Sequence, residues 1–305
     1  MLKAMPLADD HVLLLGHPPA TEFFQLVRTQ VPDGERLDAA VLVAEWKNAN
    51  THVRALQERE AGLANAPVTD LPAEMEQAAR LGLASPAARY SQRISKRRWG
   101  MVELDRLVVI QRRINLAWVA ELEAAIGPSP VAEMLIRVAT GEMMPQPVVT
   151  AVRNGDASYL LTCGSGELRF FGTRTIDPLA IDEQTMGGQV ASVIGLFVGF
   201  GVNLMCALHY RGRLVLTNGT HRAYAMRNLG IRNAPCLILE AGHEDDLELL
   251  GMRELRPQIE RYARSARPPL LKDYFDPLLR KVVPIVRVRH ALELKVTTTS
   301  LLIPP

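Results

Sequence analysis

The sequence predicts an α+β fold, in which a mixed sheet with flanking helices is joined to a helical N-terminal region and a C-terminal region of helices followed by strands. Three observations support this class. Residues 213–240 are typical of a strand, a tight turn, a helix and a second strand. Residues 21–31 and 36–60 are helix-length runs with regularly placed apolar positions. Residues 282–303 contain the alternating run VRVRHALELKVTTT, which is typical of strands.

The first of these segments reads RLVLTNGTHRAYAMRNLGIRNAPCLILE. Residues 214–216 are β-prone, the Asn-Gly pair at 218–219 breaks the strand, and residues 221–229 favour a helix. Gly230 can adopt the left-handed conformation that closes a helix, and Pro235 introduces the second apolar run at 236–239.

The turn of this unit places four chemically useful groups at the start of a helix, where main-chain amides attract anions. They are the flexible backbone of Gly219, the hydroxyl of Thr220, the imidazole of His221 and the guanidinium of Arg222. This pattern predicts a phosphate site. The alternative is an ordinary cap, with Thr220 accepting a main-chain hydrogen bond and the next two side chains facing solvent.

Composition excludes several classes of function. With 35 basic and 33 acidic residues the net charge is +2, so nucleic acid would need a local patch rather than a global field. Cys163, Cys206 and Cys236 lack CxxC spacing, which argues against a zinc site or a disulfide framework. No metal site is predicted. The N-terminus lacks the order of a secretion signal, so we expect a cytoplasmic protein.

Residues 184–208 contain no charged side chain and are long enough to span a membrane. Gln189, Ser192 and Asn203 are polar, however, and five glycines suit a bend or a close-packed segment. We therefore expect a buried core segment and no membrane span.

A basic cluster lies within residues 89–98, beside Tyr90 and Trp99. Such a cluster can track a phosphate backbone and stack on bases, and the alternative is a solvated connector. Its candidate nucleic-acid contacts are Arg93, Lys96, Arg97 and Arg98.

Several shorter elements follow from local pattern. Residues 102–110 predict a strand, and residues 116–126 and 131–139 predict helices. The Asn-Gly-Asp turn at 154–156 predicts a hairpin between residues 148–152 and 159–162, which residues 168–171 extend. Helices are also expected at 247–263, with a kink or break at Pro257, and near 270–280.

Three segments, taken in order, resemble the ParB/sulfiredoxin-like superfamily, as a divergent member. They are VELDRLVVIQRRINLAWVAELEAAI at 102–126, QPVVT at 146–150 and LVLTNGTHRAYAMRNLGIRNAPCLI at 214–238. The resemblance covers about residues 100–240. It implies a nucleotide-binding domain at 91–245 with an insertion at about 154–212. Local pattern predicts a helical N-terminal region at 1–90 before it, and C-terminal helices and a β tail at 246–305 after it.

In this superfamily the glycine box binds nucleotide phosphates. The resemblance implies that Gly219, Thr220, His221 and Arg222 line the phosphates of CTP or ATP, with or without Mg²⁺, and that Gln111, Arg112 and Arg113 face them. Two differences from the superfamily pattern argue against sulfinic acid reduction and against chromosome partitioning. Thr220 replaces the cysteine of sulfiredoxins, and Thr-His replaces the Glu-Arg of partitioning ParB proteins, with no helix-turn-helix recognised after residue 245.

Three functions remain open. The first is a nucleotide-binding protein, either an NTPase or a phosphotransferase, with His221 as phosphate donor or proton carrier and Asp105, Asp182 or Glu183 as the acidic base. The second is a nucleic-acid-binding protein or nuclease using the basic cluster. The third is a non-catalytic interaction module. The β tail could add a strand to a protein partner or a second copy.

Overall fold

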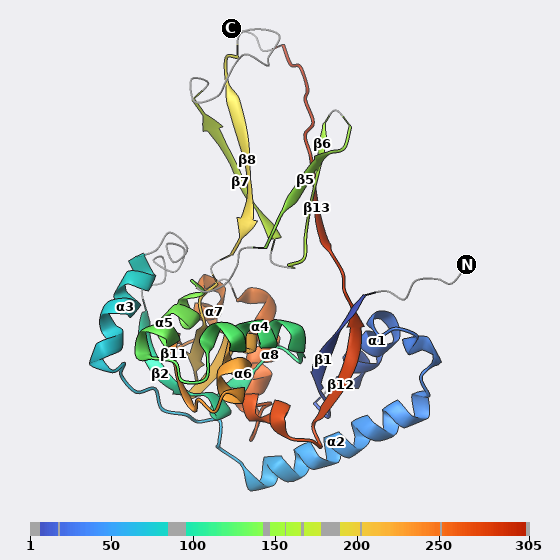
Figure 1. Ribbon diagram of the computed structural model, residues 1–305, viewed down its shortest axis with the longest axis vertical. Coiled ribbons are helices and arrows are strands. Elements are labelled where there is room, and N and C mark those ends of the chain that lie inside the picture. Colours follow the sequence, from blue (N-terminus) through green and yellow to red (C-terminus); the bar gives the residue numbers. More distant parts are fainter. Residues whose placement is uncertain are drawn as a thin grey trace. The chain divides into compact units, whose positions relative to one another are not determined.

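The α+β class is confirmed by the computed structural model, which describes residues 7–17, 19–84, 96–142, 147–155, 157–165, 168–177, 190–201, 203–250 and 252–302. These residues form eight α-helices, several 3-10 turns and four open sheets, one of which is a mixed five-stranded sheet (Figure 1). The chain divides into two compact units. Unit 1 is Met1–Met144 with Val202–Arg287, and unit 2 is Pro145–Gly201 with Val288–Pro305.

The five-stranded sheet is the centre of unit 1. Its strand order is β2-β11-β9-β10-β3, in which β10 runs parallel to β3 and antiparallel to β9, and β9 runs parallel to β11. The strands are β2 (Arg97–Glu103), β3 (Val108–Val109), β9 (Cys206–Tyr210), β10 (Arg213–Asn218) and β11 (Asn233–Ala241). Most side chains of β10 and β11 are buried. This explains why both read as nearly continuous apolar runs.

The strand-turn-helix-strand prediction for residues 213–240 is confirmed. Helix α6 (Thr220–Asn228) follows β10 directly, with Gly219 as its N-cap residue in the left-handed region at φ 94°. Gly230 also has a positive φ, 84°, where the chain leaves the helix. The expected strand at 102–110 is instead two strands, β2 and β3, separated by the 3-10 turn Leu104–Arg106.

The predicted helices around the sheet are present. Helix α4 (Leu116–Ile126) begins at Asn115, whose side chain accepts a hydrogen bond from the Trp118 amide, and it packs against α6. Helix α5 (Ala132–Thr140) packs against α3 (Ala73–Ala84).

The expectation of a mostly helical N-terminus is wrong at residues 8–14. Strand β1 (Ala8–Leu14) lies between β12 (Arg280–Val286) and β4 (Arg113–Asn115) in an antiparallel three-stranded sheet. Its partners are distant in sequence, so no local turn indicated the pairing. The helices α1 (Ala20–Gln30) and α2 (Ala39–Arg59) agree with the prediction.

The C-terminal helices of unit 1 are shorter than expected. Residues 247–263 divide into α7 (Glu244–Leu249), the 3-10 turn η6 (Arg253–Leu255) and α8 (Arg256–Arg264). Pro257 occupies the first turn of α8, where its missing amide costs no helical hydrogen bond. The predicted helix near 270–280 is only the 3-10 turn η7 (Leu271–Phe275), after which β12 begins.

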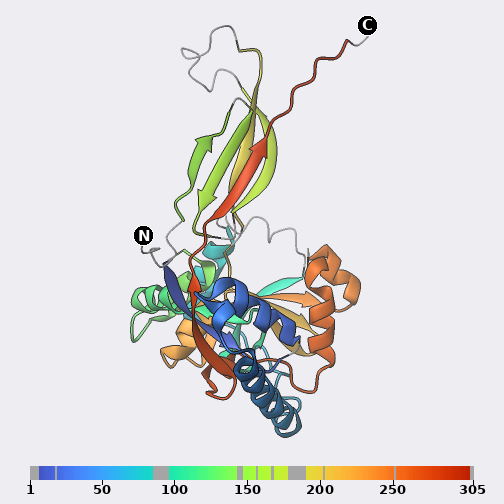
Figure 2. The same ribbon diagram turned by 90° about the vertical axis from the view of Figure 1, so that its right-hand side faces the viewer.

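The secondary structure of unit 2, in its described residues, is strands. The predicted hairpin is β5 (Thr150–Arg153) paired with β6 (Ser158–Cys163), and β13 (His290–Lys295) pairs with β6 on the other side (Figures 1 and 2). Residues 168–171 do not extend this sheet. They begin β7 (Leu168–Ile176), which pairs with β8 (Val193–Phe200) in a separate two-stranded sheet.

The expectation of a buried core segment at 184–208 is wrong for β8, since Ile194 is 68% exposed and no residue of this strand is fully buried. Residues 178–189 lie outside the described part of the chain. None of the helices in the described ranges is both long and apolar enough to cross a bilayer.

Candidate functional site

Two of the predicted turns meet at one edge of the five-stranded sheet. Strands β3 and β10 are parallel, with Val108 opposite Val215 and Val109 opposite Leu216, so both strands end at the same edge. The loop containing Gln111, Arg112 and Arg113 leaves β3 there, and the Gly219–Arg222 turn leaves β10. The main-chain amide of Asn115 donates a hydrogen bond to Nε2 of His221 at 3.0 Å, which joins the two segments directly.

Gly219 is held in a conformation and a space that only glycine fits well. Its φ is 94°, a value that residues other than glycine rarely adopt. A Cβ at this position would stand 2.9 Å from Cγ and 3.1 Å from Cα of Met205, just before β9. The close approach lets the first turn of α6 pack on the sheet, and the side chain of Thr220 is buried there.

Arg222 is a structural clamp in this fold. Its side chain is 3% exposed, and Nη1 donates to the carbonyl oxygens of Val138 at 3.0 Å, Ala139 at 3.3 Å and Asn203 at 2.8 Å. Nη2 donates to Oδ1 of Asn203 at 3.0 Å. Burial lowers the pKa of Arg222 to about 10, so it stays charged at neutral pH. The guanidinium is committed to these oxygens and does not present a free fork to a phosphate.

His221 is neutral at physiological pH. Burial first, and then the positive charges of His11, Arg113 and Arg222, lower its pKa to about 4. Burial and the charge of Arg113 also lower the pKa of His11. Nδ1 of His11 is buried and has no hydrogen-bond partner among the described residues. Because Nε2 of His221 already accepts a hydrogen bond, the ring is poorly suited to carry protons near pH 7.

The three side chains predicted to face the phosphates have different positions. Gln111 donates to the carbonyl oxygen of Arg113 at 2.8 Å. Arg112 donates to the carbonyl oxygen of His17 at 3.1 Å and to the Tyr262 hydroxyl at 3.3 Å. Arg112 also pairs with Glu22 at 3.4 Å. Arg113 is exposed, and within the described part of the chain its side chain donates to the neutral Oε1 of Gln30 at 2.6 Å. Arg113 is therefore the cation that a ligand at this edge can best reach.

The QPVVT segment does not lie in the sheet that carries the glycine turn. Its described part leads into β5 of unit 2, whereas β9 is the strand that pairs with β10. Sequence reasoning missed β9, although the run at 204–209 immediately before a Tyr-Arg-Gly-Arg turn was an available hairpin signal.

The other predicted site residues are dispersed. Asp105 precedes β3, at the opposite end of that strand from Gln111, and pairs with Arg227 at 2.9 Å. Lys96 is exposed, Arg97 lies within β2, and Arg98 pairs with Glu240 at 3.5 Å. Arg93, Asp182 and Glu183 lie outside the described residues.

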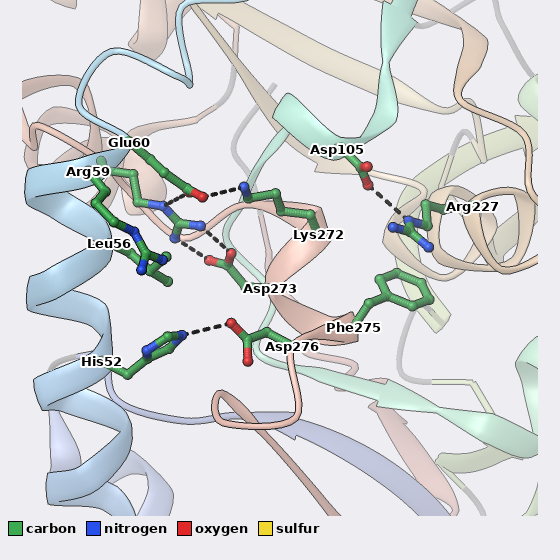
Figure 3. Close-up of a pocket in the computed structure, with 11 residues that line it drawn as sticks. His52, Leu56, Arg59, Glu60, Asp105, Arg227, Lys272, Asp273, Phe275 and Asp276 are labelled. Carbon is green, nitrogen blue, oxygen red and sulfur yellow. Dashed lines mark hydrogen bonds and ion pairs between the residues drawn. The ribbon is translucent and has the colours of Figure 1, made fainter.

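A second polar site, which sequence reasoning missed, is a cavity of about 340 Å³ among α2, η7 and the end of α6 (Figure 3). Its wall contains the fully buried Arg267, whose guanidinium forms a fork with the carboxylate of Asp273 and a 3.0 Å bond to Glu60. Burial alone would raise the pKa of Asp273, but the nearby His17 ring, 3.7 Å away, and the hydrogen bonds and charge of Arg267 lower it overall. This cluster joins α2 to η7.

No cluster of three metal-ligating side chains occurs within the described ranges. No family model, curated protein or solved structure matches the chain.

Proposed function

We propose that the protein binds a nucleotide, CTP or ATP, with its phosphates at the Gly219–Arg222 turn and a fold of the ParB/sulfiredoxin-like kind. One observation carries this proposal: the loops after two adjacent parallel strands, β3 and β10, leave the sheet at the same edge, and one of them opens a helix through a positive-φ glycine. In sheets containing parallel strands, ligands typically bind outside the carboxyl ends of those strands.

The groups proposed to contact the phosphates do not include the guanidinium of Arg222, which the sequence had suggested. The main-chain amides at the start of α6 and the helix dipole supply the attraction, and Arg113 supplies the reachable charge. Arg222 and His221 act as positioning residues, since their hydrogen bonds fix the turn against Asn203 and Asn115. Burial is the main cause of the low pKa of His221, and the charge of Arg113 contributes to it; the same positive charge favours a bound anion.

The proposal is limited to binding. An NTPase or phosphotransferase needs a base near the attacking group, and Asp105 lies at the far end of β3 in an ion pair. The nucleic-acid alternative is weaker, because Arg98 of the basic cluster pairs with Glu240 at 3.5 Å.

The test is calorimetric titration of the full chain with CTP, ATP, GTP and ADP, and with the matching nucleosides, which lack phosphate. We expect binding of at least one nucleotide and none of its nucleoside. Arg113→Ala should weaken that binding about tenfold, because one charge-assisted hydrogen bond is lost. The matched control is Arg36→Ala, since Arg36 is 85% exposed and distant in the chain. Equal binding by nucleoside and nucleotide, or an unchanged affinity in Arg113→Ala, would contradict the proposal.

A further inference from the structure

The register of the β7–β8 hairpin sorts its side chains onto two chemically different faces. Directly paired residues of antiparallel strands share a face, and Phe170 is opposite Val198 while Thr175 is opposite Ile194. Following these pairs along both strands defines the uncharged face of the hairpin: Leu168, Phe170, Thr173, Thr175, Ile194, Leu196, Val198 and Phe200. It contains six large apolar side chains, two threonines and no charge.

The opposite face carries charge, and its two phenylalanines, Phe171 and Phe197, are 58% and 43% exposed. Arg169 and Arg174 lie on it, opposite Gly199 and Gly195. The irregularity between Phe170 and Gly172 turns the ring of Phe171 over Gly199, where a Cβ would meet it at 2.9 Å. Arg174 lies over the ring of Phe197 at 5.9 Å. The hairpin is therefore amphipathic, and two adjacent phenylalanines, Phe170 and Phe171, belong to opposite faces.

The uncharged face is open to solvent at its centre. Ile194 is 68% exposed, Phe170 44% and Leu196 37%. A two-stranded hairpin is only marginally stable by itself in water, and an apolar face of this kind is normally covered by a second layer. Within unit 2, β13 approaches β7, but these three side chains stay exposed.

We propose that the uncharged face packs against the same face of a second copy of this chain, forming a small two-layer β sandwich about a two-fold axis. The face is self-complementary in charge, because two uncharged surfaces meet without repulsion, whereas the opposite face would bring Arg169 and Arg174 close to their own copies.

The two threonines favour protein over lipid as the covering layer. Thr173 and Thr175 lie beside apolar residues, and a hydroxyl buried in hydrocarbon without a partner is costly. Across a two-fold axis the hydroxyls of one copy can meet those of the other. The hairpin is only two strands wide, and β8 has eight residues, roughly 26 Å at about 3.3 Å per residue. The area that this face can bury is therefore small for a stable interface. A weak dimer, in the micromolar range or weaker, is expected.

The experiment is sedimentation velocity of the full chain over a wide concentration range. We expect a monomer at low concentration and a dimer at high concentration. Phe170→Glu should abolish the dimer. Phe171→Glu should leave it intact, because this neighbouring phenylalanine, 58% exposed against 44% for Phe170, lies on the charged face. Ile194→Lys is the second disrupting variant if Phe170→Glu fails to fold by circular dichroism.

Three results would overturn the proposal. One is a wild-type chain that stays monomeric at every concentration. Another is a dimer that survives both Phe170→Glu and Ile194→Lys. The third is a monomer that instead binds phosphatidylcholine–phosphatidylserine vesicles through Phe170, which would identify lipid as the covering layer.

Discussion

Asn115 and His221 connect the two loops at the edge of the five-stranded sheet. The amide of Asn115 donates to Nε2 of His221 at 3.0 Å, while the side chain of Asn115 accepts from the Trp118 amide at 3.1 Å and so caps α4. One residue therefore fixes both the start of α4 and the orientation of the imidazole at the start of α6. Since Nε2 must be unprotonated to accept this bond, the neutral ring carries its proton on Nδ1.

The first prediction concerns this ring. The pKa of His221 is about 4 in the folded chain, below its ordinary 6.5, so the unfolded chain binds the proton more tightly. Stability is complete above about pH 6.5 and falls as the pH drops toward 4, by up to about 3.5 kcal/mol at about 1.4 kcal/mol per pKa unit. Urea unfolding at pH 7 and pH 5 measures the first part of this loss, about 2 kcal/mol. His221→Gln, which keeps an acceptor but cannot be protonated, should reduce it.

Nucleotide binding should raise the pKa of His221. A phosphate placed beside His221 opposes the positive charges of Arg113 and His11 that help to lower its pKa. We expect the His221 resonance, followed by NMR during a pH titration, to report a higher pKa when the nucleotide is bound. An unchanged pKa under saturating nucleotide would place the ligand elsewhere.

Arg222 should be essential for stability rather than for affinity alone. Removing its guanidinium leaves the carbonyl oxygens of Val138, Ala139 and Asn203 buried without this donor. We expect Arg222→Ala to lower the free energy of unfolding by about 3 kcal/mol, and Arg222→Lys by less, because an ammonium keeps the charge but loses the fork. Chemical denaturation measures both, and Arg36→Ala should stay within about 0.5 kcal/mol of wild type.

Local chemistry in the sequence was enough to predict several elements, and it failed where distant segments decide the outcome. The Asn-Gly turn before α6 and the 154–156 hairpin both depend on residues close in sequence. Strand β1 is different, since Ala8 pairs with Val286 at the other end of unit 1. No periodicity within residues 8–14 could reveal that partner.

In the candidate site, too, the features set by local sequence were predicted and those set by distant segments were not. Gly219 was predicted because its conformational role is local. The partners of Arg222 come from the end of α5 and from residue 203, so its commitment to carbonyl oxygens was invisible in the sequence. The Arg267–Asp273 pair was missed for a related reason: a basic residue in a proline-containing connector is normally solvated, and only the packing of Glu60 and His17 around it buries it.

That buried pair supplies a prediction of its own. Arg267 and Asp273 are 0% and 1% exposed. Breaking a buried pair strands one charge, so Arg267→Met and Asp273→Asn should each cost about 3–5 kcal/mol. The double variant should cost clearly less than the sum, because neither charge is then left alone. A double-mutant cycle from urea unfolding gives the coupling. The pKa of Asp273 is lowered, so its contribution is present above the unfolded value of 3.8 and is lost as the pH falls through the lower folded value.

Unit 1 should fold without unit 2. The amide of Met205 donates to the carbonyl oxygen of Ala139 at 2.7 Å, so the chain leaves unit 1 after α5 and re-enters it at nearly the same place. We expect a variant in which about four glycine and serine residues replace 145–201, and which ends at Arg287, to unfold cooperatively. The same variant ending at residue 279 is the matched control. It lacks β12, the partner of β1 along its whole length, and should lose the transition. Thermal unfolding followed by circular dichroism separates the two, and an unfolded or aggregated longer variant would mean that unit 1 depends on unit 2 for its stability.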